Sequence, residues 1–533
     1  QPTILFSRAM NEQLLYSPVN ICSVEVTCVS PFYHPSFQDC LALASDSSLI
    51  IGNFDSLQRV QITSYPLNEA PRHICYHKTS GTVAVCSTRT KLTPRGEESS
   101  ERVLFLDEST LSIDTAFELD LYETGISITS SFLKDNLDEQ EKEYVVVGTA
   151  FVLPEESQPT RGRILVFEII TTSIANEIHR QITLVVEIQT RGVAYTLATL
   201  KGRLVAGIDS KIQIYRLSLS EEDGIRSPEM ILECGYHGHI LALYVKTYND
   251  LILVGDILRS ICVLRFKERD SLVEEVARDF NSNLMRSVEI WNENYFIGAE
   301  DHGNIFIMKN PTNPKSDEER NRLEVQSGYH LGDFVNAITK GSLSRTTTIS
   351  QINDVDDNNN NETKNQNQLQ DQNEEVNGKS KIHIVESLLL GTVSGRLSTL
   401  FPISKKDFIF LTILEKCLIQ VVKNLSVGGL SHEDWRGFYH ERRSRNQGYR
   451  RNTIDGDLIE KFLDLNDSVM EQVTKYVNDE LLHLSKPDND NLKESDKISA
   501  DKVNNQSENL KENFIPLTVN DIVQRVEDLS RMH

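Results

Sequence analysis

The feature that most constrains the fold is a short two-strand unit that recurs along most of the sequence. In each unit an apolar run ends at or near a glycine, a polar turn follows, and a second apolar run comes next. Leu204–Gly207 with Ile212–Tyr215, and Leu251–Gly255 with Ile261–Leu264, show this pattern clearly. The glycines that mark the unit are Gly52, Gly148, Gly207, Gly255, Gly298 and Gly391.

The spacing of these glycines predicts a β-propeller. From Gly148 to Gly298 they stand roughly 40 to 60 residues apart, near the period that propeller blades show. The interval before Gly148 holds a weaker unit, Val83–Cys86 with Val103–Leu106, and the interval after Gly298 holds an insertion. We therefore expect a mainly β fold with a seven-bladed propeller. A β-sandwich is the alternative, but it predicts no internal repeat of this length.

A polar insertion at residues 345–380 interrupts the repeat. Residues 356–372 are almost entirely Asn, Asp, Gln and Glu and contain no aromatic side chain. Such a segment buries too little apolar surface to offset the entropy of ordering it. We expect a disordered loop between two strands of a propeller that spans residues 67–404.

After residue 404 the spacing of apolar residues changes to the helical period of about 3.6. Asp407, Asp457 and Thr518 each precede a helical pattern, and Asp521 stands three residues after Thr518 as in a capping box. Residues 405–533 are therefore predicted to form a small α-helical C-terminal domain.

The charge and the cysteines limit the possible partners and compartments. The chain has 55 basic and 78 acidic residues, a net charge of −23, which repels a phosphate backbone and argues against general nucleic-acid binding. The eight cysteines include no pair with the two-residue spacing of a zinc or redox motif. We expect buried reduced thiols and a location in the nucleus and cytoplasm.

The sequence carries no obvious targeting segment. No apolar run reaches the length of about 18 residues that a membrane span needs, and there is no signal peptide. The chain begins at Gln1 in the middle of a pattern and without an initiator Met, so we expect an N-terminally incomplete protein.

No group of residues predicts catalysis, a metal site or a cofactor. The carboxylate pairs Glu155–Glu156 and Asp455/Asp457 stand at a turn and at a helix start, without a His or nucleophile beside them, so we assign them turn and cap roles. The segment from Cys234 to His239 offers one Cys and two His, which is too few for zinc without a distant fourth ligand. We expect a protein that is not an enzyme.

A basic cluster follows the first predicted helix and leaves two interpretations open. Arginines interleaved with aromatic residues are able to bind nucleic acid through phosphate contacts and stacking. They are equally able to connect to the acidic surface of the chain, the interpretation that the net charge favours. The possible nucleic-acid patch consists of Arg436, Arg442, Arg443 and Arg445.

Several long segments resemble one known family. They read GTAFVLPEE at 148–156, ARDFNSN at 277–283, LGDFVN at 331–336, IDGDL at 454–458 and EDLSRMH at the end. These segments are similar to the third propeller and the C-terminal helical domain of the DNA damage-binding protein 1 family. The same superfamily includes the large subunit of the cleavage and polyadenylation specificity factor and the third subunit of splicing factor 3b.

The resemblance implies a scaffold function. Members of the family are adaptors of cullin-4 RING ubiquitin ligases in DNA damage repair, including nucleotide excision repair, and they dock WD-repeat substrate receptors, often through a helical motif. Residues 1–66 would be the tail of a preceding propeller, cullin-4 would bind outside this chain, and damaged DNA would be reached only indirectly. The alternative is a pre-mRNA processing scaffold that binds nucleic acid.

The resemblance also gives candidate receptor-binding residues. One position departs from the family pattern, because Leu284 stands where the family has a Trp, which would weaken or alter receptor binding. The candidates are Tyr195, Leu243, Tyr244, Arg259, Arg278, Leu284, Phe334, Asn336 and Val393.

Overall fold

The computed structural model divides the chain into two compact units, Gln1–Ile62 and Thr63–His533. The first unit contains the hairpin β1(Thr3–Ser7)–β2(Leu14–Pro18) and the three-stranded sheet β3(Cys28–His34), β4(Phe37–Ala44) and β5(Leu49–Asn53). The structure describes residues 3–7, 14–18, 27–34, 37–44, 49–53, 65–93, 96–136, 141–174, 177–222, 225–311, 314–341, 387–421, 431–437, 452–484 and 516–530.

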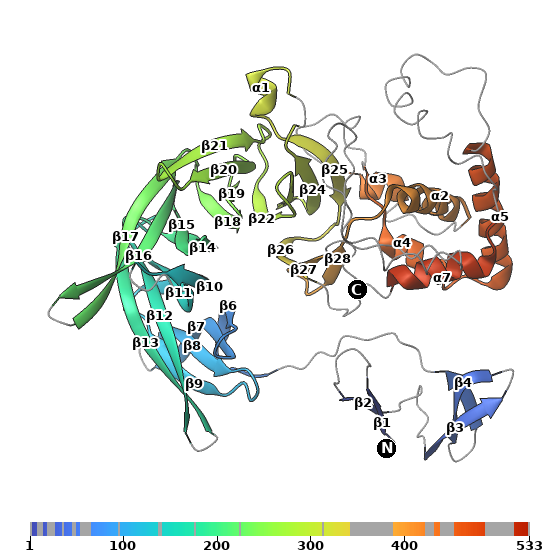
Figure 1. Cartoon of the computed structure of the whole chain (residues 1–533), viewed down its shortest axis with the longest axis horizontal. Coiled ribbons are helices and arrows are strands. Elements are labelled where there is room, and N and C mark those ends of the chain that lie inside the picture. Colours follow the sequence, from blue (N-terminus) through green and yellow to red (C-terminus); the bar gives the residue numbers. More distant parts are fainter. Residues whose placement is uncertain are drawn as a thin grey trace, which may run out of the picture. The chain divides into compact units, whose positions relative to one another are not determined.

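In the described residues the second unit contains a β-propeller of six blades (Figure 1). This confirms the predicted mainly β propeller, but not the seven blades expected from the sequence. Five blades are four-stranded antiparallel sheets whose strands pair in sequence order, and the sixth has three strands. Blade 1 is β6(Ala70–His77), β7(Thr82–Thr93), β8(Gly96–Asp107) and β9(Ile113–Glu118); blade 2 is β10(Glu123–Lys134), β11(Glu141–Phe151), β12(Gly162–Ile174) and β13(Glu177–Thr190); blade 3 is β14(Ala194–Leu200), β15(Arg203–Ile208), β16(Lys211–Glu222) and β17(Ile225–His237).

The other three blades follow the same strand order. Blade 4 is β18(Ala242–Tyr248), β19(Leu251–Asp256), β20(Ile261–Lys267) and β21(Leu272–Arg278); blade 5 is β22(Met285–Ile290), β23(Tyr295–Glu300), β24(Asn304–Lys309) and β25(Glu324–His330), with α1(Asp317–Arg320) before β25; blade 6 is β26(Val335–Lys340), β27(Leu388–Thr392) and β28(Leu397–Leu400). The polar insertion falls between β26 and β27, and residues 342–386 lie outside the described part.

The marker glycines of the repeat lie where neighbouring blades touch. Gly148 is in the second strand of blade 2, and a Cβ atom there would lie 2.8 Å from the carbonyl oxygen of Ala194 in the first strand of blade 3. A Cβ at Gly207 would likewise lie 3.1 Å from the carbonyl oxygen of Ala242 in blade 4. At these two positions only glycine fits, because the next blade packs directly on the backbone.

The first strand of every blade carries a β-bulge. In β14 the pairing jumps from Ala194 to Thr196, and in β18 it jumps from Ala242 to Tyr244. The remaining bulges occur at the matching place in the other blades. A bulge adds one unpaired residue and redirects the side chains around it. The extra residues are Arg72, Ile126, Tyr195, Leu243, Arg286 and Asn336.

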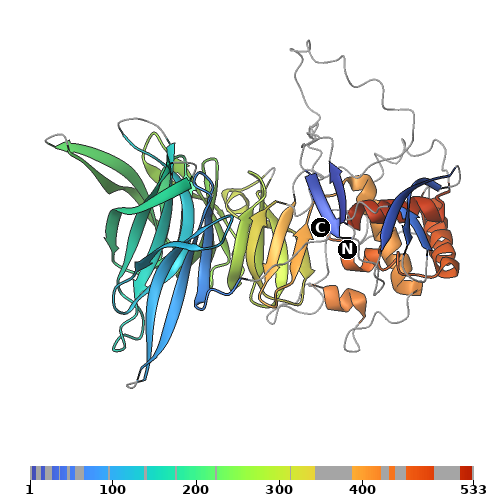
Figure 2. The same ribbon diagram turned by 90° about the horizontal axis from the view of Figure 1, so that it is seen from below.

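The apolar core lies between the blades. Val245, two residues after the bulge of β18, packs against Ile212 and Ile214 of blade 3. Val288 packs in the same way against Leu251 and Leu253 of blade 4. The view at right angles shows the strands of the sheets running between the two ends of the propeller (Figure 2). Each blade therefore depends on its neighbour for the burial of one face.

Helices follow the propeller, as the change of period predicts. They are α2(Lys405–Val421), α3(His432–Arg436), α4(Gly456–Glu460), α5(Asp467–Leu484) and α7(Val519–Ser530). Their buried apolar residues form one cluster, with contributions from α2, α4, α5 and α7. No helix in the described residues is long and apolar enough to cross a membrane.

The start of α7 follows the predicted capping chemistry, whereas the starts of α2 and α4 differ from it: Asp457, expected to precede its helix, lies in the first turn of α4. Thr518 and Asp521 form the reciprocal capping box, with Thr518 Oγ1 donating to Asp521 Oδ2 at 2.7 Å and Asp521 N donating back at 3.3 Å. In α2 the cap is Ser404 rather than Asp407, because the Asp407 N–H donates to Ser404 Oγ at 3.2 Å. Asp455 precedes α4 but makes no capping bond, because its carboxylate binds other groups.

We expect Gly148→Ala to destabilise the full chain by about 1–3 kcal/mol, since the added methyl group would collide with the backbone of Ala194. Urea unfolding monitored by circular dichroism measures the change. Gly456→Ala is the matched control, because no atom of the described part of the chain lies within 4 Å of a Cβ at that position. Equal stability of the two variants would contradict the proposed role of the repeat glycines.

Candidate docking surface

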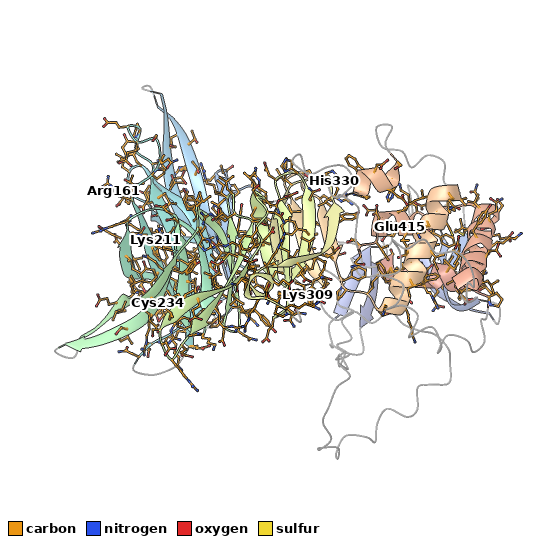
Figure 3. The ribbon with its side chains drawn as sticks, turned by 90° about the horizontal axis from the view of Figure 1, so that it is seen from above. Arg161, Lys211, Cys234, Lys309, His330 and Glu415 are labelled. Atoms are coloured by element: carbon orange, nitrogen blue, oxygen red, sulfur yellow. The ribbon has the colours of Figure 1, made fainter. Side chains whose placement is uncertain are left out.

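One end of the propeller gathers exposed apolar side chains. Because the strands of a blade are antiparallel and sequential, the loops between blades and the turns between second and third strands lie at the same end, which we call the interblade end. In Figure 3, His330 marks this end of blade 5 and Lys309 the opposite end. The exposed apolar residues of the interblade end on blades 3 to 6 are Ile240, Leu258, Phe280, Leu284, Phe334 and Val393.

The loop between β21 and β22 is held by a buried carboxylate. Asp279 accepts hydrogen bonds from Ser260 Oγ at 2.7 Å and from the backbone N–H and side-chain amide of Asn281 at 3.0 and 2.6 Å. With Asp279 fixed, Phe280 stays 65% exposed and Leu284 is also exposed. The loop thus presents two apolar side chains outward on a rigid polar base.

The turn between β19 and β20 is held in a similar way. Asp256 is buried and accepts the backbone N–H groups of Ile240 at 2.7 Å, Leu258 at 3.0 Å and Arg259 at 3.3 Å. Burial acts to raise the pKa of Asp256, but hydrogen bonds from His239 and from these amides outweigh it and lower the pKa. The charged carboxylate therefore ties two apolar loops of blade 4 together.

Phe334 and Val393 form the part of the surface on blade 6. The Val393 N–H donates to the carbonyl oxygen of Phe334 at 2.9 Å, and Asp333 accepts the Phe334 N–H at 2.8 Å. Phe334 is 46% exposed and Val393 is 67% exposed. Arg286 lies 5.8 Å from the centre of the Phe334 ring and pairs with Asp301. The surface thus combines an aromatic ring, an aliphatic residue and an arginine.

The structure places the residues predicted from the resemblance in three different settings. Tyr195, Leu243 and Asn336 are bulge residues of blades 3, 4 and 6 at equivalent positions, and Tyr195 and Leu243 are half-buried. Tyr244 is half-buried and packs on the core between blades 4 and 5. Arg259 is exposed at the interblade end, and its Nη1 donates to the carbonyl oxygen of Gly238 at 2.7 Å.

Arg278 differs from the other candidates because its side chain is largely enclosed. Its Nη2 lies 2.6 Å from Glu275 Oε2 and 4.0 Å from Cys262 Sγ. Only 17% of the side chain is exposed. The guanidinium is therefore engaged inside blade 4, and a partner would reach little of it.

Four residues of the surface were missed by the sequence reasoning: Ile240, Leu258, Phe280 and Arg286. A register alignment of the repeats would have found Arg286, which occupies the bulge position of Leu243 and Asn336. The other three lie in loops, where no periodicity separates an exposed apolar residue from a buried one.

The arginine cluster does not form one patch in the described residues. The side chain of Arg436 is buried, and its Nε lies 2.7 Å from Asp455 Oδ2, so this guanidinium is not available for a phosphate. Arg442, Arg443 and Arg445 lie outside the described residues.

The other constellations considered for chemistry have separate local partners. His237 Nδ1 lies 3.3 Å from Ser210 Oγ, and His239 Nδ1 lies 3.6 Å from Asp256 Oδ2. Glu156 accepts a hydrogen bond from Thr160 at 3.1 Å in an exposed turn. Within the residues that the structure describes, no three ligand-type side chains come together as a metal site would require.

The comparisons with known proteins define the class of protein. A family model described as the CPSF A subunit region matches residues 100–464, which is more than half of the chain. The chain therefore belongs to the CPSF A subunit region family.

The curated relatives agree with the predicted resemblance and confirm it. DNA damage-binding protein 1 of Oryza sativa subsp. japonica is 38% identical over 487 residues, and DNA damage-binding protein 1a of Arabidopsis thaliana is 38% identical over 488 residues. Each alignment covers 91% of this chain and 40% of the relative. The chain thus spans about 40% of the length of these relatives.

Asp279→Ala should destabilise the chain by about 1–3 kcal/mol, because it leaves Ser260 and Asn281 without their buried acceptor. Hydrogen exchange should quicken at residues 280–284, and urea unfolding gives the loss of stability. Asp270→Ala, at an exposed turn of the same blade, is the control and should change neither. A loop 280–284 that exchanges at the unaltered rate in Asp279→Ala would refute the anchoring role.

Proposed function

We propose that this chain is a non-enzymatic adaptor that docks partner proteins through the interblade end of blades 4 to 6. The observation that carries the proposal is the set of six exposed apolar side chains at this end, including Phe280 and Phe334. Apolar and aromatic groups rimmed by arginines are typical of protein-binding surfaces. The polar anchors Asp256 and Asp279 hold the loops in place before any partner binds, which lowers the cost of ordering on binding.

The partner class that suits this surface is an amphipathic helix of a WD-repeat substrate receptor. A helix presents apolar side chains at positions i, i+3, i+4 and i+7, which fill an extended apolar surface. The relatives' names connect them with DNA damage. We therefore infer an adaptor function in a cullin-4 ubiquitin ligase that acts in DNA repair, with cullin-4 bound outside this chain and damaged DNA reached through the receptor.

The compartment proposed for this function is the nucleus and cytoplasm. Cys86, Cys262 and Cys417 are buried free thiols in the described residues. Burial raises the pKa of the Cys86 and Cys262 thiols to about 12, which keeps them protonated and unreactive. Reduced buried thiols suit a reducing compartment.

A pre-mRNA processing scaffold is the second candidate function. The family model is named for the CPSF A subunit region, and this name supports the candidate. Direct nucleic-acid binding has less support, because the net charge is −23 and Arg436 is already paired with Asp455. Salt-sensitive retention on an RNA or DNA matrix would favour this candidate over the adaptor.

We further propose that a seventh blade completes the propeller between blade 6 and blade 1. Among the residues that the structure describes, none lies within 4 Å of a Cβ at Gly391 of blade 6, whereas Gly148 and Gly207 are covered by the next blade. Ile74 of blade 1 is 70% exposed, whereas the equivalent Val288 of blade 5 is buried. The face of blade 6 at Gly391 and the face of blade 1 at Ile74 thus resemble the faces that pack against a neighbouring blade elsewhere in the propeller.

The docking proposal predicts that Leu258→Glu together with Phe334→Glu weakens binding of a helical WD-repeat receptor motif by at least about tenfold, because two apolar anchors are replaced by charges. Fluorescence anisotropy with a labelled peptide of that motif measures the affinity. Leu272→Glu is the control, since this exposed residue lies at the opposite end of blade 4. Unchanged binding by the double variant would contradict the proposed surface.

The seventh blade is tested by Gly391→Val. If another sheet packs on Gly391, valine should lower the thermal midpoint as strongly as Gly148→Val does, since overpacking costs about 1–3 kcal/mol. An unchanged midpoint for Gly391→Val, beside a lowered one for Gly148→Val, would show that the face is open.

A further inference from the structure

Helix α3 reaches from the helical part of the chain to the loop that carries Phe334. Nη1 of Arg436 lies 3.3 Å from the carbonyl oxygens of both His330 and Leu331. The Trp435 ring meets the His330 ring edge to face, with centroids 5.1 Å apart and planes at 87°. Figure 1 shows α3 beside β25, and Figure 3 shows His330 on the side of the propeller that faces the helices.

Buried polar groups fix α3 on the helical core. Asp455 Oδ2 lies 2.8 Å from His432 Nε2 and 2.7 Å from Arg436 Nε, so one carboxylate holds both ends of α3. The backbone N–H of Asp455 donates to the buried Glu415 of α2 at 3.2 Å. The guanidinium of Arg436 also lies over the Tyr329 ring at 5.0 Å. Arginine is able to contact a carboxylate, two carbonyl oxygens and an aromatic ring at once, because its planar guanidinium group carries several N–H donors.

The charge state of this anchor is set by the same contacts. Burial alone would raise the pKa of Asp455, but the hydrogen bond from His432 and the positive charge of Arg436 outweigh it and lower the pKa. Because the carboxyl pKa is lower in the folded chain, the ion pair contributes its full stability at a pH above the ordinary aspartate pKa of 3.8. This contribution is lost as the pH falls through the pKa of the folded state. The anchor is therefore intact at neutral pH.

Trp435 occupies the space under the loop of residues 331–334. Gly332 has φ +81°, and a Cβ there would lie 2.8 Å from Cζ2 of the indole. The loop adopts a left-handed backbone at this point and leaves no room for a side chain. Two residues later Phe334 stands exposed and bonded to Val393 through the backbone. The indole thus supports the segment that presents Phe334.

We propose that Trp435 and Arg436 are positioning residues for partner docking: they set the conformation of Phe334 without contacting the partner. This inference rests on the proposed docking function. A loop already held in its binding conformation loses less entropy when a partner binds, and this gain is lost if α3 is detached. By linkage, a partner bound at Phe334 also stabilises the contact of α3 with the propeller.

A double-mutant cycle tests this positioning role in the full chain. Trp435→Ala should weaken binding of the labelled receptor-motif peptide about fivefold when Phe334 is present, and less than about twofold in a Phe334→Ala background, because the two residues act through one contact. In a Leu258→Ala background the fivefold effect should persist in full. The same factor in all three backgrounds, or no effect in any of them, would overturn the proposal.

Two further arms keep the test decisive. If Trp435→Ala lowers the thermal midpoint of the whole chain, the milder variants Trp435→Phe and Arg436→Lys are used in its place. Trp435→Phe should then retain most of the affinity for the labelled receptor-motif peptide. Hydrogen exchange provides a readout without a partner: Trp435→Ala should quicken exchange at residues 331–334 and leave residues 256–260 unchanged. If the unaltered chain does not bind the peptide, the docking function fails. Hydrogen exchange then tests the support of the loop by α3 separately, and an unchanged exchange rate at residues 331–334 in Trp435→Ala would refute that support.

Discussion

The contact between a glycine of one blade and the first strand of the next is the constraint on which the rest of the structure depends. At Gly148 and Gly207 the backbone of the following blade comes so close that any side chain would collide with it. In blades 4 and 5 this close approach buries the residues two positions after the bulge, Val245 and Val288, against the preceding blade. The blades hold each other through apolar packing, so their loops do not have to supply stability and remain free to carry function.

The loops of the interblade end present apolar side chains to solvent on buried polar anchors. Buried carboxylates hold the loops of three of its exposed apolar residues: Asp256 holds the loops of Ile240 and Leu258, and Asp279 holds the loop of Phe280. A buried carboxylate that accepts hydrogen bonds from several groups is fixed in place by them. Such a base allows apolar side chains to stay in water without collapsing onto the propeller, which is the physical requirement for a preformed docking surface.

The helical part of the chain contributes to the same surface, because α3 supports one of its loops. The sequence suggested two interpretations for the arginine-rich segment, and for Arg436 the structure supports the connector, since this residue binds Asp455 and two backbone carbonyls of the last full blade. Asp455, predicted as a helix cap, serves as the buried partner of this arginine. A buried charge pair of this kind is costly to remove from water, and the hydrogen bonds from Arg436 to Asp455 and to the carbonyl oxygens of His330 and Leu331 offset part of that cost.

The sequence by itself determined the period of the repeat, the strand pairs such as Leu251–Gly255 with Ile261–Leu264, and the change to helices after residue 404. These features follow from local spacing of apolar residues, which one chain segment is enough to define. Only the tertiary structure decided which side chains gather at the interblade end and that Arg278 and Arg436 are enclosed. Exposure and ion pairing depend on neighbours that are distant in the sequence, and local periodicity contains no information on them.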